Sequence, residues 1–199
     1  KQSAKDGQPA LNFATPIIEG MKSQLSNWPS FAGAGMMADV SFYNNPVQFY
    51  DDEILSQSVL SLIFSGVRMD STILHGCSPA SGYHKITKAD GNIIFEIDDK
   101  PALEVISDLL GKDSGIEWDN FPLFITLGVN RGNKFDKFQE ENYANRLCLA
   151  VDKEHKAMVM FEPDLKPGDE IQLMQRSIDF NYIESSVNSL FEKIGNRKP

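Results

Sequence analysis

The stretch LHGCSPASGYHKITKADGNIIFEIDDKPALEVISDLLG, from Leu74 to Gly111, decides the fold of this chain. It begins with a turn of small residues and continues with two strand-like runs, which the turn signal Asp90-Gly91 predicts to be a hairpin. A helix follows, with Pro101 in its first turn and Gly111 at its end. The stretch holds almost no recognisable catalytic chemistry, so it predicts a scaffold that presents a pocket.

On the N-terminal side of this stretch, Leu11 to Phe13 has the pattern of a strand end, and an amphipathic helix is expected from Pro16. Residues Val47 to Leu55 predict a hairpin with Asp51-Asp52 at its tip. The nearly continuous apolar run from Ser58 to Gly66 predicts a buried strand.

On the C-terminal side, Phe121 to Val129 predicts another buried strand. Three strands separated by turns follow, in YANRLCLAVD, KAMVMFEP and EIQLMQR, and Pro167-Gly168-Asp169 is the clearest turn. The last helix is expected from about Asp179 to Ile194. This order predicts an α+β fold with layered, mostly antiparallel or mixed sheets and flanking helices.

Length and composition limit the function classes. The chain has 199 residues and a formal net charge of −9, which argues against a nucleic-acid groove because such a groove needs a basic stripe. It contains no run of 18 apolar residues, so no membrane span is expected. Two cysteines in a chain of this size favour reduced thiols and a cytoplasmic location. The chain starts at Lys1 rather than Met, which predicts a fragment, a processed product or a trimmed chain.

The reactive residues form no complete catalytic or metal constellation. His75, Cys77 and His84 lie close in sequence, but no CxxC or HExxH pattern accompanies them, so a half-buried histidine beside a buried thiol is the favoured interpretation. A hydrolase that uses Cys77 remains the enzyme alternative. The carboxylates Asp51-Asp52-Glu53, Asp98-Asp99 and Glu140-Glu141 are interpreted as solvated tips and helix caps. No catalytic residue and no metal ligand are therefore predicted.

The segment GCSPASGYHKITKADGNIIFEIDDKPALEVISDLL resembles the core of the FIST domain, whose pattern is a Gly-Cys-x-Pro turn, then V-T-x-A-x-G-N, then L-D-G-x-P-A-L. AGAGMMAD resembles the family's G-G-x-A-x-D segment through Gly35 and Asp39. YANRLCLAVDKEHKAMVMFEPDLKPGDEIQLMQRS resembles the start of its C-terminal half, through Arg146 and Gly168. The departures in the first segment are Asp99, where the family usually has Gly, and Ala80-Ser81, which replaces Ile-Gly. Those in AGAGMMAD are Ala34, Met37 and Ala38.

The resemblance implies that residues 1–114 form the later part of the FIST N-terminal half and residues 115–199 the beginning of its C-terminal half, with a boundary near Ser114. It further implies a non-catalytic sensory domain of a signal-transduction protein, usually bacterial. Such domains work with a kinase, cyclase or chemoreceptor output, and amino acids have been suggested as their ligands.

The same resemblance and motif set imply a ligand pocket formed by the glycine turns and by polar side chains. Arg146 is expected to bind an anionic ligand, and its alternative is an ion pair with a carboxylate. Two other functions stay open: a haem-based nitric-oxide sensor using His75, His84 or His155, and a protein-interaction adaptor without a small ligand. The expected ligand-binding residues are Gly35, Asp39, His75, Cys77, Thr87, Asn92 and Arg146.

Overall fold

A computed structural model describes residues 12–36, 46–111 and 124–195 of the chain. These residues carry helices and antiparallel strands, so the predicted α+β class is confirmed. The chain divides into two compact units, Lys1–Met69 and Asp70–Pro199, and each is described by itself. Within the described residues, no helix has the length and apolar character needed to span a bilayer.

The first unit contains one helix and one hairpin: α1 (Ala14–Gln24), β1 (Val47–Tyr50) and β2 (Glu53–Ser56). The hairpin was predicted correctly, with Val47 opposite Ser56 and the turn at Asp51 and Asp52. The expected strand end is wrong at Phe13, which has extended backbone but serves as the N-cap of α1, while Leu11 lies outside the described residues.

The buried strand predicted from Ser58 to Gly66 is also wrong. These residues belong to no strand, and the side chains of Ile63 and Phe64 are 93% and 72% exposed. The physical reason is that a strand is stabilised by the neighbours on which it packs, not by its apolar content alone. No other described strand pairs with this segment.

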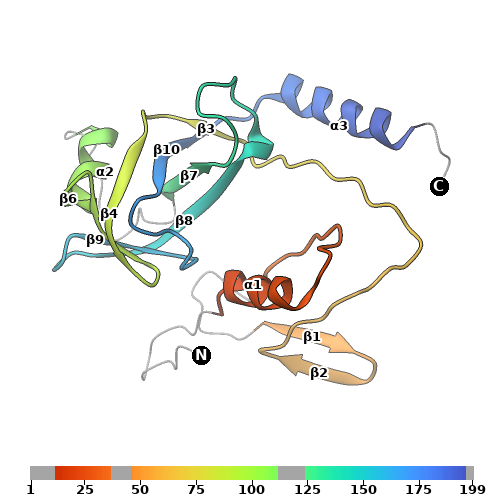
Figure 1. Cartoon of the computed structure of the whole chain (residues 1–199). Helices are drawn as coiled ribbons and strands as arrows, with labels where there is room; N and C mark the ends of the chain where they lie inside the picture. Colours follow the sequence, from red (N-terminus) through yellow and green to blue (C-terminus); the bar gives the residue numbers. More distant parts are fainter. Residues whose placement is uncertain (1–11, 37–45, 112–123, 196–199) are drawn as a thin grey trace. The chain divides into compact units, whose positions relative to one another are not determined.

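The second unit contains the sheet that positions the candidate site (Figure 1). Its strands are β3 (Cys77–Pro79), β4 (His84–Asp90), β5 (Ile93–Ile97), β6 (Lys100–Pro101), β7 (Thr126–Asn130), β8 (Tyr143–Asp152), β9 (Ala157–Met160) and β10 (Glu170–Arg176). Its helical elements are α2 (Ala102–Leu110), the 3₁₀ turn η2 (Glu140–Asn142) and α3 (Phe180–Ile194).

The strand pairings of this unit close on themselves. The order β10–β4–β5–β9–β8–β7 returns to β10, and every pairing is antiparallel. Strand β3 also pairs with β10, where Cys77 lies opposite Arg176. The predicted hairpin at Asp90-Gly91 and the turn at Pro167-Gly168 are confirmed, and both glycines have positive φ.

The main core lies on one face of this closed sheet, and α2 contributes the buried side chains of its apolar stripe. The helix α2 begins later than the sequence pattern predicted. Asp98 and Asp99 form a turn with positive φ, and the helix begins at Ala102, after Pro101 as its N-cap. Asp98 does not cap the helix because its carboxylate pairs with the ring of His84 and accepts a hydrogen bond from the amide of Lys85.

Strands from both sides of Ser114 pair within this one sheet, as β10 does with β3 and β4. Ser114 itself lies outside the described residues, and the division into 1–114 and 115–199 stays a prediction. The strand predicted from Phe121 is confirmed as β7, beginning at Thr126, and residues 121–123 are likewise outside the described part. The last helix is confirmed as α3, capped by the carboxylate of Asp179.

Candidate functional site

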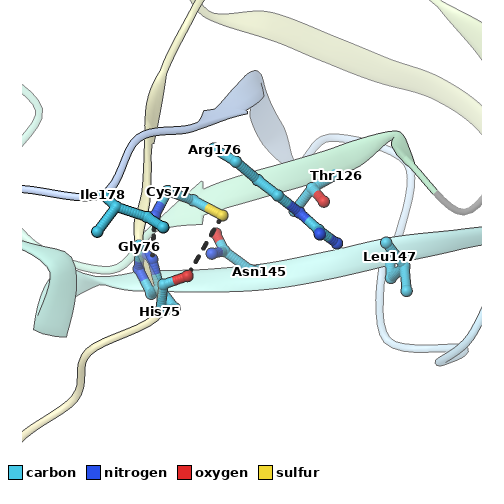
Figure 2. A pocket seen from close by; sticks show the side chains of 8 residues that line it. All are labelled: His75, Gly76, Cys77, Thr126, Asn145, Leu147, Arg176 and Ile178. Carbon is cyan, nitrogen blue, oxygen red and sulfur yellow. Dashed lines mark hydrogen bonds between the residues drawn. The ribbon is translucent and has the colours of Figure 1, made fainter.

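An open cavity of about 390 Å³ lies within the second unit, at the end of the sheet where β3 begins and β10 ends. Its volume falls in the range of small-molecule pockets. Figure 2 shows the side chains around it. The lining residues are His75, Gly76, Cys77, Thr126, Asn145, Leu147, Arg176 and Ile178.

The strand register explains why these residues meet. Side chains directly opposite each other in an antiparallel pair lie on the same face of the sheet. Cys77 lies opposite Arg176, and Thr126 of β7 lies opposite Leu147 of β8. Asn145 is two residues before Leu147 and shares its face. The cavity is therefore on the face of the sheet opposite the one that packs Leu127 into the main core.

A buried carboxylate holds the turn at one side of the cavity. Oε2 of Glu140, in η2, accepts hydrogen bonds from the backbone amides of His75 and Gly76 at 2.6 and 3.0 Å. Gly76 has a φ of +63°, a conformation that favours glycine and turns both amides toward one acceptor. The interpretation of Glu140 as a solvated tip is wrong. Only 6% of the residue is exposed, and its carboxylate accepts a hydrogen bond from Gly76, which is 64 residues away in the sequence.

The ring of His75 is engaged on both sides. Nδ1 accepts a hydrogen bond from the amide of Cys77 at 3.1 Å, so Nε2 carries the proton and donates to the carbonyl oxygen of Glu140 at 3.1 Å. A haem iron would need one of these nitrogens. His75 therefore does not fit a haem ligand. His84 and His155 each direct Nδ1 to an aspartate and lie outside the cavity.

The thiol of Cys77 is buried beside the cavity and 3.6 Å from the carbonyl oxygen of His75. Burial raises the pKa of this thiol above its ordinary value, the positive charge of Arg176 lowers it in part, and the carboxylate of Glu140 raises it again. A nucleophilic cysteine needs a lowered pKa. This thiol is therefore poorly suited to attack a substrate at neutral pH.

Two polar groups at the cavity lack partners. The guanidinium of Arg176 makes no hydrogen bond or ion pair with another residue in the described part of the chain. The side-chain oxygen of Asn145 is buried and also has no hydrogen-bond partner there. An unpaired buried acceptor costs about 1–3 kcal/mol, and such a group in a native site calls for an explanation. A ligand that pairs with both groups would supply one.

Of the residues expected from the sequence, the structure brings only His75 and Cys77 together at this cavity. Gly35 is exposed and belongs to the first unit, and Asp39 lies outside the described residues. The sequence reasoning missed Thr126, Asn145 and Arg176, which come from three strands, because their meeting depends on strand register.

The other expected residues make structural contacts elsewhere. The hydroxyl of Thr87 accepts a hydrogen bond from the amide of Asp99, and Nδ2 of Asn92 donates to the carbonyl oxygen of Met160. Arg146 forms a two-pronged ion pair with Asp164. An ion pair with a carboxylate was the alternative to ligand binding that the sequence analysis gave for Arg146. The role of Arg146 in ligand binding stays a prediction.

The described residues contain no group of side chains suited to bind a metal ion. Across residues 12–36, 46–111 and 124–195, no three histidine, cysteine or acidic side chains are grouped so that they could hold an ion.

Part of the chain matches a known protein family. Residues 10–100 match the FIST N domain family. The match confirms the resemblance seen in the sequence, and FIST domains are associated with signal transduction. It covers the His75–Cys77 wall of the cavity, whereas Thr126, Asn145 and Arg176 follow the matched FIST segment.

A relative of the FIST-matched chain is the uncharacterized protein MJ1623 of Methanocaldococcus jannaschii, which is 22% identical over 161 residues. The alignment covers 78% of this chain and 31% of the relative, so the chain spans about a third of the relative's length. No solved structure gave a significant match.

Proposed function

We propose that this chain is a non-catalytic sensory domain that binds a small ligand in the cavity at the start of β3 and passes the binding event to a signalling output. The proposed setting is the cytoplasm, with a kinase, a cyclase or a chemoreceptor as the output. The FIST N match supports signal transduction as the general role. The two free cysteines are compatible with a reducing compartment.

The observation that carries the proposal is the buried side-chain oxygen of Asn145, in the wall of an open cavity, which has no hydrogen-bond partner among the described residues. Buried polar atoms in folded proteins nearly always have a partner. A ligand that donates a hydrogen bond to this oxygen would remove the cost of leaving it unpaired, and that gain would contribute to affinity.

The cavity wall supports binding more than catalysis. The pKa of the Cys77 thiol is raised chiefly by burial, and both ring nitrogens of His75 hold the adjacent turn together. Neither group is thus prepared to act as a nucleophile or a general base. Both are suited to forming a rigid wall, which lowers the entropy cost of binding.

The test is a thermal-shift screen of the purified protein against a panel of small metabolites, compared with Leu147→Trp. Leu147 lines the cavity, so the larger indole fills it without changing the charge. Leu109→Trp, on an exposed position of α2, is the matched control. A metabolite that raises Tm in wild type and in Leu109→Trp, but not in Leu147→Trp, supports the proposal. No Tm change with any metabolite, or equal changes in both variants, contradicts it.

Protein binding is a second candidate function, favoured by the exposed apolar side chains of the segment between β2 and β3. Leu62, Ile63 and Phe64 are consecutive and 72–93% exposed. Contiguous exposed apolar surface of this kind is typical of interaction sites. Sedimentation velocity over a range of concentrations tests the simplest partner, a second copy. A dimer that disappears in Ile63→Asp supports this function, and a monomer at every concentration contradicts pairing with a second copy.

A further inference from the structure

We propose that the cavity binds a small organic anion and that Arg176 is the residue that anchors its negatively charged group. This inference rests on the proposed function, because it names the chemical class of the ligand at the same cavity.

Arg176 is placed over the cavity by the pairing of β10 with β3. Its register partner is Cys77, so both side chains leave the sheet on the cavity face. Figure 2 shows the extended side chain of Arg176 directed toward Thr126, with Asn145 on the side of Cys77 and His75, and all of these residues line the same cavity. In keeping with this placement, the positive charge of Arg176 lowers the pKa of the Cys77 thiol in part, against the larger effect of burial.

Among the residues that the structure describes, the guanidinium of Arg176 has no carboxylate partner, which is unusual in a strongly acidic protein. The sequence has 28 acidic residues against 19 lysines and arginines. Arg146, on strand β8, shows the common outcome: it is paired with Asp164. The buried carboxylate of Glu140, beside the cavity, accepts hydrogen bonds from the amides of His75 and Gly76 instead. Arg176 therefore keeps its planar set of donors for a ligand, and such donors match a carboxylate or phosphate oxygen pair.

The remaining lining residues narrow the ligand class further. The unpaired oxygen of Asn145 accepts hydrogen bonds, so it favours a ligand that also carries a donor such as a hydroxyl or an amine. Leu147 and Ile178 supply apolar contacts at the same cavity. The best fit is a short carbon chain with an anionic group at one end and a donor near it.

The experiment uses three matched probes on the ¹⁵N-labelled protein: sodium acetate, sodium glycolate and neutral acetamide, with sodium chloride added to keep the ionic strength constant. Acetate has only the anionic group, glycolate adds a hydroxyl donor, and acetamide lacks the charge. Backbone amide shifts of Gly76, Cys77 and Arg176 report binding. We expect both anions to shift these signals with saturation in wild type, glycolate at lower concentration than acetate, and acetamide to shift them at least tenfold more weakly.

Arg176→Gln should abolish the saturable shifts by the anions, and Arg176→Lys should retain them with weaker affinity because an ammonium cannot make the two-pronged contact. Arg131→Gln removes the same charge outside the cavity and should behave as wild type. Arg176 is exposed at the end of β10, so these variants should fold, and their dispersed spectra check this.

Three outcomes would overturn the inference, and each bears differently on the proposed function. Unchanged anion shifts in Arg176→Gln remove Arg176 as the anchor. Shifts by acetamide that match or exceed those by acetate remove the anionic class but leave a ligand cavity. If no probe shifts the cavity signals, the anionic class is wrong, and the metabolite screen with Leu147→Trp decides the proposed function separately.

Discussion

The carboxylate of Glu140 lies 2.6 Å from the backbone nitrogen of His75 and accepts its hydrogen bond. The same oxygen also accepts the amide of Gly76, and the backbone amide of Glu140 donates in turn to the hydroxyl of Tyr182 in α3. One buried residue, through its side chain and its backbone amide, therefore joins the turn before β3, the 3₁₀ turn η2 and the last helix. The shape of the cavity wall depends on this contact.

Replacing Glu140 with Ala should destabilise the protein by about 3 kcal/mol, because it leaves two amide donors without their charged acceptor. Urea unfolding measures the change. Glu140→Gln should cost less, since an amide oxygen can still accept one hydrogen bond. Glu141→Ala is the control: Glu141 is adjacent but exposed, so its change should stay within about 0.5 kcal/mol. Equal costs at both positions would contradict the role given to Glu140.

Replacing Gly76 with Ala tests the backbone of the same turn. An added Cβ would meet nothing closer than the carbonyl oxygen of Ser177 at 3.9 Å, so there is space for it. The cost should come from the positive φ alone, about 1–2 kcal/mol. Gly82→Ala is the matched control, with no neighbour within 4 Å and no positive φ, and should be neutral or slightly stabilising. Equal free energies of unfolding for the two variants would contradict this account.

Gly128→Ala should destabilise the sheet by about 1–3 kcal/mol through overpacking. The added Cβ would lie 2.4 Å from Sδ of Met174 on the neighbouring strand β10. Met174→Ala removes that side chain, so the double variant should lose less stability than the sum of the two single variants. Denaturant unfolding of all four proteins measures this coupling. Strict additivity would show that Met174 is not what excludes a side chain at Gly128.

Local sequence patterns predicted those parts of the fold whose cause is local. The turns at Asp90-Gly91 and Pro167-Gly168 and the helix ending at Gly111 follow from backbone preferences of the residues themselves. The segment from Ser58 to Gly66 could not be predicted in this way, because an apolar run becomes a strand only when another strand pairs with it.

The candidate site depends on information that the sequence does not display. Alternation along β8 shows that Asn145 and Arg146 point to opposite faces, but not which face carries the cavity. The register of β8 against β7 puts Asn145 and Leu147 on the cavity side, and Arg146 on the other side. Arg176 reaches the cavity because β10 pairs with β3, across about 100 residues of sequence.

The Arg146–Asp164 pair gives the protein an acid-sensitive contribution to stability. Burial alone would raise the pKa of Asp164, but the hydrogen bonds and charge of Arg146 outweigh it and hold that pKa below the ordinary value. A carboxylate whose pKa is lowered by folding stabilises the protein above its unfolded pKa of about 3.9, and this contribution is lost as pH falls below that value. The free energy of unfolding should therefore fall between about pH 5 and pH 2 more steeply in wild type than in Asp164→Asn.

Arg146→Met should cost about 2–4 kcal/mol at pH 7, because it leaves the half-buried carboxylate of Asp164 without its partner. In this variant burial is opposed only by the smaller lowering effects of the Asp164 backbone hydrogen bond and of Arg131, so the pKa of Asp164 should rise and acid should relieve part of the loss instead of adding to it. Urea unfolding at pH 7 and pH 4 measures both effects.

The double variant Arg146→Met with Asp164→Asn should recover part of the stability, and the glycolate shifts at Cys77 should persist in it. Loss of those shifts in the folded double variant would instead assign Arg146 to the ligand, as the sequence pattern predicted.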